Sequence, residues 1–156
     1  EAVIAHSDAQ AAALWKLRES ISEAQKIEGL SIKHDISVPL SAIPEFIRRA
    51  DQALHRQHDG LRIVCFGHVG DGNLHYNPSK AEAQDNAAFI ATGSAVSRIV
   101  HDLVHELDGS ISAEHGIGQA KRLLLPLVKP PVELDLMRSV KAMLDPHGLL
   151  NPGKVL

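Results

Sequence analysis

Cysteine is almost absent from this sequence of 156 residues, and so are long apolar runs and any excess of positive charge. A single cysteine, Cys65, excludes an intrachain disulfide, and the chain does not open on a charged and apolar leader, so we expect a reducing, cytoplasmic location. No apolar run approaches the length of about 20 residues that a membrane span needs. A net charge of −3 leaves no basic surface for nucleic acid and no polybasic segment for a membrane.

The chain carries enough apolar residues for one domain. They make up 44% of the sequence, and a domain of this length buries roughly 68–70% of its unfolded surface. The first residue is Glu1 rather than Met, and a helical pattern begins almost at once. We therefore expect residues 1–156 to form one domain of a longer polypeptide.

Helical and strand periodicities alternate along the sequence. Helices are expected at about 7–28, 41–58, 81–107, 119–127 and 132–144, and strands at 32–38, 61–69, 74–77 and 110–114. The order strand, helix, strand, strand, helix, strand is that of a ferredoxin-like unit. The sequence predicts an α+β fold, with a ferredoxin-like antiparallel sheet, helices on one face and two further C-terminal helices.

The segment from Gly67 to His75 places two histidines around an Asp-Gly pair. Asp71-Gly72 favours a two-residue type I′ turn, which would set His68 directly opposite His75. Opposed Cβ atoms lie about 4.5–5.5 Å apart, so both imidazoles could bind one divalent ion. Asn77 would follow on the same face. The alternative is two ordinary polar side chains beside a tight turn.

A third ligand and a general base are available in the segment Ser112 to Gly118. Glu114 is the best remaining carboxylate, and two histidines with one carboxylate suit zinc, manganese or ferrous iron. His115 has the residue type of a general base, because an unperturbed imidazole has a pKa of about 6.5. Strand alternation would send Glu114 and His115 to opposite faces, so the strand has to end between them. A solvated acid at a strand end is the alternative for Glu114.

Two further groups of residues have weaker patterns. His101 and His105 are one helical turn apart, as in the zincin motif, but Asp102 stands where that motif needs a glutamate. Arg18 and Ser22 share a helix face, and with Lys33 they could bind a carboxylate. All three side chains could equally be solvated.

Taken together, several motifs resemble the C-terminal domain of the flavin-linked oxidases and dehydrogenases of 2-hydroxy acids. This family has the vanillyl-alcohol-oxidase flavin fold and includes D-lactate dehydrogenase, the glycolate oxidase flavin subunit and D-2-hydroxyglutarate dehydrogenase. The matching segments are 15–22, 33–39, 67–75, 112–118 and 151–154, and they are spread along essentially the whole chain.

The resemblance implies a role for each matching residue. His68, His75 and Glu114 would hold a divalent metal, usually zinc; Arg18, Ser22, Lys33 and Asn77 would contact substrate carboxylates; His115 would be the base and Asn151 would approach the flavin. The implied reaction oxidises a 2-hydroxy acid to a 2-oxo acid. The metal lowers the pKa of the hydroxyl, His115 takes its proton, and hydride passes to the flavin.

The family's FAD-binding domain lies N-terminal to this region and has no counterpart in the sequence. The resemblance therefore implies three partners, namely that FAD-binding domain, a small 2-hydroxy acid and an unidentified electron acceptor. We expect this domain alone to be inactive, with FAD bound mainly by the missing domain, and a homodimer is left open. Two other functions remain open, a metal-free ferredoxin-like interaction module and a zincin-like metallohydrolase using His101 and His105.

Overall fold

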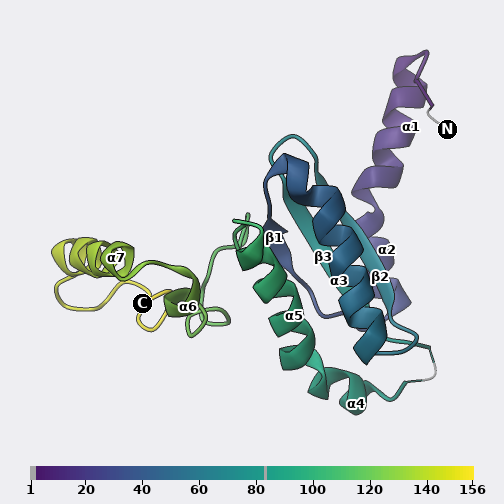
Figure 1. Ribbon diagram of the computed structural model, residues 1–156. Coiled ribbons are helices and arrows are strands. Elements are labelled where there is room, and N and C mark those ends of the chain that lie inside the picture. Colours follow the sequence, from purple (N-terminus) through teal and green to yellow (C-terminus); the bar gives the residue numbers. More distant parts are fainter. Residues whose placement is uncertain (1–2, 83) are drawn as a thin grey trace.

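The computed structural model describes residues 3–82 and 84–156. The elements are α1 (Asp8–Glu19), α2 (Ile21–Glu28), β1 (Asp35–Ser37), the 3-10 turn η1 (Leu40–Ala42), α3 (Ile43–Gln57), β2 (Arg62–His68), β3 (Asn73–Ser79), α4 (Asn86–Ala91), α5 (Gly93–Glu106), α6 (Leu125–Val128) and α7 (Pro131–Leu144). Figure 1 shows α3 and α5 side by side over one face of a small sheet, with α1 and α2 on its other side. The predicted α+β class is confirmed.

The sheet has the order β1-β3-β2, and both pairs are antiparallel. The strand predicted at 110–114 is wrong, because it is reduced to one antiparallel bridge between Ser110 and Ser37 on the outer side of β1. The backbone N–H groups of residues 113–115 donate to the side chain of Asp35 instead of to a strand. The bridge still occupies the place of the fourth strand in a ferredoxin-like sheet.

The predicted register of the hairpin is also wrong. His68 pairs with Asn73, and Phe66 pairs with His75, so the turn spans the four residues 69–72. Two contacts stabilise this longer turn: the Asp71 carboxylate accepts from the N–H of Asn73 at 3.0 Å, as in an Asx turn, and the N–H of Val38 donates to the carbonyl of Gly72 at 3.1 Å. His68 and His75 still share a face of the sheet, one two-residue step apart.

Two predicted long helices are each divided by a hydroxyl residue. Ser20 separates α1 from α2 and donates its hydroxyl to the carbonyl of Lys16 at 2.7 Å. Thr92 separates α4 from α5 and donates to the carbonyl of Phe89 at 2.7 Å. Such bonds back to the preceding turn compete with the helix and bend it. The helix predicted at 119–127 is shorter than expected, since only α6 is helical there.

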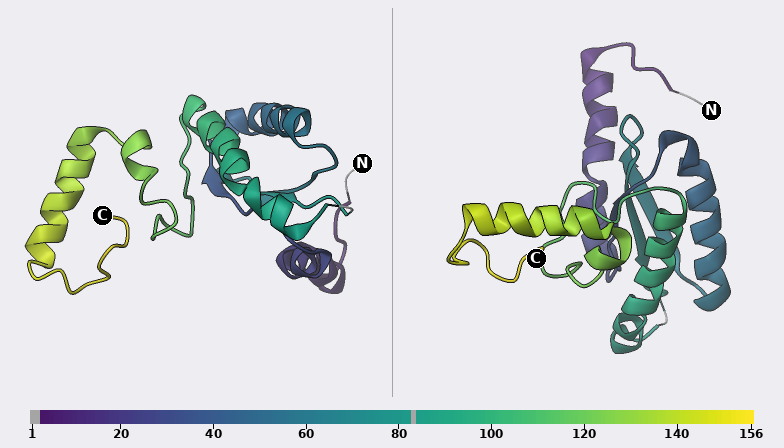
Figure 2. Two further views of the ribbon diagram at one scale, coloured as in Figure 1. Left: turned by 90° about the horizontal axis from the view of Figure 1, so that it is seen from below. Right: turned by 60° about the vertical axis from the view of Figure 1, so that its left-hand side comes forward.

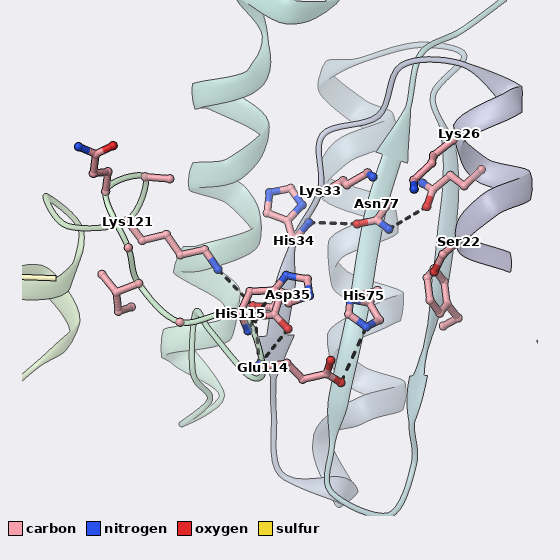
Figure 3. Close-up of a pocket in the computed structure, with 17 residues that line it drawn as sticks. Ser22, Lys26, Lys33, His34, Asp35, His75, Asn77, Glu114, His115 and Lys121 are labelled. Carbon is pink, nitrogen blue, oxygen red and sulfur yellow. Dashed lines mark hydrogen bonds and ion pairs between the residues drawn. The ribbon is translucent and has the colours of Figure 1, made fainter. Parts of the chain in front are cut away.

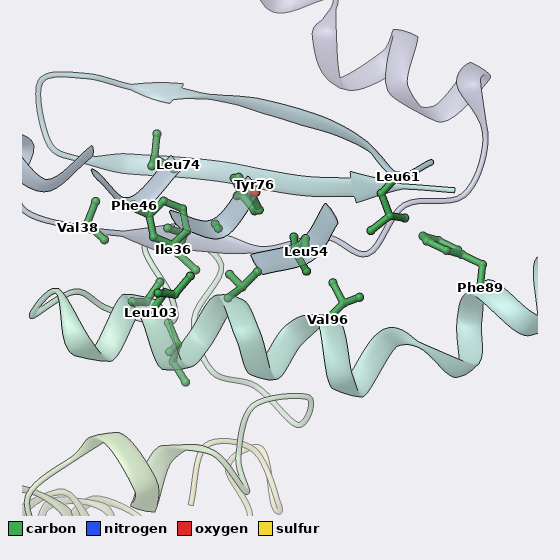
Figure 4. Close-up of a cluster of buried hydrophobic side chains, with 14 residues drawn as sticks. Ile36, Val38, Phe46, Leu54, Leu61, Leu74, Tyr76, Phe89, Val96 and Leu103 are labelled. Carbon is green, nitrogen blue, oxygen red and sulfur yellow. The ribbon is translucent and has the colours of Figure 1, made fainter. Parts of the chain in front are cut away.

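The core lies between the sheet and the pair α3 and α5 (Figure 4). Helical spacing of four residues supplies Phe46, Ala50 and Leu54 from α3 and Val96, Val100 and Val104 from α5, all fully buried. Tyr76 of β3 packs edge-on against Phe46 and donates its hydroxyl to Asp51 at 2.6 Å. Burial and the Asp51 carboxylate raise the pKa of Tyr76, which therefore stays neutral.

The C-terminal helices lie to the side of the sheet rather than over it, as Figure 1 and the left-hand view of Figure 2 show. One face of α7 carries apolar side chains that remain exposed, namely Val132, Leu136, Val140 and Met143. Among residues 3–82 and 84–156, no helix has the length and apolar character needed to cross a bilayer.

The turn of the hairpin gives a direct test of the fold. Gly72 has φ 74°, and a Cβ there would collide with the Val38 carbonyl oxygen. Because a left-handed backbone already costs a non-glycine residue about 1–2 kcal/mol, we expect Gly72→Ala to lower the free energy of unfolding by about 2 kcal/mol or more. Gly70→Ala in the same turn has open space around its Cβ and should change stability by no more than about 0.5 kcal/mol. Urea denaturation measures both, and equal effects would contradict this account of the turn.

Candidate functional site

A cavity of about 600 Å³ lies on the side of the sheet that faces away from the core. Four segments line it: residues 22–26 of α2, residues 33–35, the hairpin strands β2 and β3, and the loop 114–121 (Figure 3). Histidine, carboxylate, lysine and amide side chains all reach it. The alternation of β3 explains why the core and the cavity meet here, because Leu74 and Tyr76 point into the core while His75 and Asn77 line the cavity.

Two of the predicted metal ligands, His75 and Glu114, line one end of this cavity, and the third, His68, adjoins Glu114 just outside the lining. The Nδ1 of His68 lies 3.4 Å from the Oε1 of Glu114, and the Nε2 of His75 lies 4.0 Å from the same oxygen. The side-chain amide of Asn73 also donates to Glu114. Two imidazoles and one partly exposed carboxylate are a donor set that fits a divalent metal with open coordination positions.

The most compact group of potential ligands is a different one. Ligand atoms of Asp35, His75 and His115 lie within 4.8 Å of one another. Asp35, however, is only 4% exposed, and its Oδ2 accepts from the N–H groups of residues 113–115 and from the hydroxyl of Ser112. An oxygen that already accepts several hydrogen bonds has little capacity left for a metal. We therefore favour Glu114 over Asp35 as the carboxylate ligand, with His75 common to both sets.

His115 is placed as a base would be. Its side chain is 66% exposed, its Nδ1 lies 4.0 Å from the Oδ2 of Asp35, and its ring lies 5.6 Å from that of His75. Burial alone would raise the pKa of Asp35, but the N–H groups of His115, Glu114 and Ala113 and the charge of His115 hold this pKa below its usual value. Asp35 is therefore ionised beside His115.

Three of the four predicted substrate contacts line the cavity, namely Ser22, Lys33 and Asn77. The orientation of the Asn77 amide is fixed, because its Oδ1 accepts from the N–H of His34 at 3.0 Å and its Nδ2 donates to Gln25 at 3.0 Å. Nδ2 carries a second hydrogen, so Asn77 is a donor toward the cavity.

The fourth predicted substrate contact, Arg18, does not line the cavity but packs behind Phe66, which does. Its guanidinium lies over the ring of Phe66, 5.2 Å from the ring centroid, and donates to the carbonyl of Gly67 at 3.2 Å. The Phe66 ring in turn lies 4.9 Å from the ring of His75. Arg18 therefore supports the wall of the cavity, holding α1 against β2.

Asn151 is not brought to the cavity. It lies in the exposed tail after α7, with φ 48°, and Figures 1 and 2 place this tail to the side of the sheet.

The zincin-like pair His101 and His105 borders a small cavity of about 80 Å³, but within the described residues 3–82 and 84–156 no third ligand completes a metal-binding group with it. His105 is exposed on α5, whereas the ring of His101 packs edge-on against the buried His34 at 5.5 Å. Burial lowers the pKa of both His34 and His101 to about 4.

Two residues at the site were not singled out from the sequence, Asp35 and Lys121, although Asp35 lies within the family-like segment 33–39. Asp35 occupies a polar position of a short strand, and Lys121 follows an irregular loop. Both act through contacts between distant segments: Lys121 donates to the carbonyls of Asp35 at 3.3 Å and of Ile111 at 2.6 Å. The family-like segment 33–39 could have pointed to Asp35, whereas Lys121 is found only from the tertiary contacts.

Comparison with known proteins agrees with this geometry. Residues 1–155 match the family described as FAD linked oxidases, C-terminal domain. The chain belongs to this family. Among its relatives, a D-2-hydroxyglutarate dehydrogenase of Xanthomonas citri pv. viticola is 46% identical over 99% of this chain and 33% of the relative. One of Stutzerimonas stutzeri is 41% identical, with the same coverage. A mitochondrial D-2-hydroxyglutarate dehydrogenase of Danio rerio is 43% identical over 92% of this chain and 26% of the relative.

The chain thus spans about a third of the length of the bacterial relatives it matches and about a quarter of the zebrafish one. This FAD-linked oxidase domain carries the cavity, and the relatives contain a further, longer part.

The buried histidines predict how stability depends on pH. An unfolded histidine has a pKa of about 6.5, so between pH 6.5 and 4 the unfolded chain binds more protons than the folded one. The free energy of unfolding should fall as the pH is lowered through this window, by up to about 1.4 kcal/mol per pH unit for each histidine. His101→Phe, which keeps a ring beside His34, Lys121 and Asp102, should reduce this slope. His105→Gln, an exposed change on the same helix, should not. Urea unfolding at pH 7 and pH 5 compares the variants, and an unchanged slope in His101→Phe would contradict the assignment.

Proposed function

We propose that this domain is the substrate-binding and metal-binding part of an FAD-dependent 2-hydroxyacid dehydrogenase that oxidises D-2-hydroxyglutarate to the 2-oxo acid. One observation carries the proposal: two of the predicted metal ligands, His75 and Glu114, lie at one end of a cavity, and the third, His68, lies beside Glu114. The lining of the same cavity includes His115 and two of the predicted carboxylate contacts, Lys33 and Asn77. The names of the relatives support the choice of substrate.

His68, His75 and Glu114 would hold the metal, for which we propose zinc, an ion that catalytic sites bind with two histidines and a glutamate. When bound, the ion supplies a Lewis acid that lowers the pKa of the substrate hydroxyl, and FAD bound by the rest of the polypeptide supplies the hydride acceptor. His115 then removes the hydroxyl proton, for which its exposed ring beside the ionised Asp35 is suited.

Lysine side chains give the cavity its preference for acids. Lys26, Lys33 and Lys121 all line it. The Nζ of Lys121 is bound to backbone carbonyls, whereas Lys26 and Lys33 form no ion pair with any residue of the described ranges 3–82 and 84–156. Two free ammonium groups beside Ser22 and the Asn77 amide suit a substrate with two carboxylates. Direct contact between Arg18 and the substrate stays a prediction.

The exposed apolar face of α7 is the surface we assign to the FAD-binding domain. Val132, Leu136 and Met143 are 75%, 65% and 72% exposed, and their spacing places them on one side of the helix. The length of the relatives leaves room for a partner domain. The tail with Asn151 belongs to the same C-terminal part, so its approach to the flavin would occur across this interface.

Metal content tests the ligand set directly. The purified protein should hold one divalent ion per chain, measured by elemental mass spectrometry, and His68→Ala should lose it because two protein ligands do not suffice for a stable site. His105→Ala, an exposed histidine on α5, is the matched control and should keep the ion. Metal lost only from His105→Ala would place the site on α5, and metal kept by both variants would favour Asp35, His75 and His115.

Substrate binding tests the lysines. In the full-length enzyme, Lys33→Met should raise the KM for D-2-hydroxyglutarate by about 10-fold or more, since a hydrogen bond to a charged group contributes about 1.5–3 kcal/mol, while kcat should change less. Lys16→Met on the exposed surface of α1 is the control and should leave KM unchanged. A Lys33→Met enzyme with the KM of the wild type would remove Lys33 from the substrate site.

A further inference from the structure

We propose that Asp35 is a positioning residue, whose buried carboxylate fixes the loop 112–115 so that Glu114 and His115 both face the cavity. The proposal rests on the function proposed above and adds a residue to it. Asp35 itself would not touch the metal or the substrate.

The Asp35 carboxylate is the anchor of this loop. It accepts hydrogen bonds from the N–H groups of Ala113 at 3.1 Å, Glu114 at 3.1 Å and His115 at 2.9 Å. The hydroxyl of Ser112 donates to it at 3.3 Å. Successive N–H groups that converge on one anion form a compact concave backbone arrangement, so one side chain determines the path of all four residues.

This arrangement explains how consecutive residues serve one site. In a strand, Glu114 and His115 would point to opposite faces. Because their N–H groups both turn toward Asp35, the backbone leaves the extended conformation, and Figure 3 shows both side chains on the cavity side of the loop.

Asp35 also links the loop to the histidine on the sheet. It is the residue of β1 that pairs with His75 of β3, so the same residue sets the position of His75 and that of Glu114 and His115. The next residue, Ile36, is fully buried in the core, which holds β1 in place. Lys121 clamps the other side by donating to the carbonyls of Asp35 and Ile111.

Asp35→Asn in the full-length enzyme tests the proposal. The substitution replaces one carboxylate oxygen with an NH₂ group, which cannot accept hydrogen bonds from the backbone N–H groups of residues 113–115. We expect faster hydrogen exchange of the amides of residues 113–115, and a Zn²⁺ affinity, measured by competition with a chelator, that falls by about 10- to 100-fold, as is common when an outer partner of a metal ligand is removed. Asp35→Glu keeps the charge and the acceptors and should recover part of both properties.

Ile36→Val is the matched control, because it weakens the same strand from its buried side by about 0.5–1.5 kcal/mol without touching the loop. It should leave the Zn²⁺ affinity and the exchange of residues 113–115 as in the wild type. If Ile36→Val and Asp35→Asn reduce both to the same extent, Asp35 is merely structural and the proposal is wrong. The proposal is equally wrong if Asp35→Asn changes neither.

The readouts separate this proposal from the proposed function. A wild-type enzyme that oxidises no 2-hydroxy acid would overturn the function, while metal affinity and amide exchange would still decide the role of Asp35. A wild-type enzyme that binds no Zn²⁺ would overturn the metal site, and amide exchange alone would then decide whether Asp35 fixes the loop. Should Asp35→Asn fail to fold, Asp35→Glu, which moves the acceptors by one methylene, should still show a partial loss of both properties that Ile36→Val does not show, and the absence of any loss would overturn the proposal.

Discussion

The two faces of β3 are the constraint on which the rest of the structure depends. Leu74 and Tyr76 of this central strand bury their side chains under α3 and α5, while His75 and Asn77 between them line the cavity. Because successive side chains of a strand point to opposite faces, burial of the apolar side chains of β3 also fixes the positions of the polar side chains between them. The side of the cavity formed by β3 is held in place by the core residues on the opposite face of the same strand.

The segments that bring the remaining chemistry to β3 are held by polar contacts instead. Helix α2 reaches it through the chain of amides from His34 to Asn77 to Gln25, and α1 through Arg18 on Phe66 and Gly67. The loop with Glu114 reaches it through Asp35. Directional hydrogen bonds suit this purpose, since they set the orientation of the groups that would bind a substrate.

Local periodicity predicted the strands of the hairpin, the helices packed on them and the α+β class, because each depends on side chains close in sequence. It failed where a distant group decides the outcome. The turn at 69–72 depends on Val38, and the loss of a strand at 110–114 depends on Asp35. The same limit applies to the site. Residue types and motifs singled out His68, His75, Glu114 and Asn77, but Arg18 is held by stacking on Phe66, and Asn151 lies in an exposed tail whose end is bound to the cavity loop by the hydrogen bond from Val155 to Gly118.

The four-residue turn that closes the hairpin has a consequence for how the protein can fail. A slip of β3 by one residue would exchange its two faces, putting His75 and Asn77 under the helices and Leu74 and Tyr76 into the cavity. The hydrogen bond from the N–H of Val38 to the carbonyl of Gly72 and the close approach of the two backbones oppose such a slip. A misaligned hairpin would lose its core together with its chemistry, so the register that builds the core is also the register that builds the cavity.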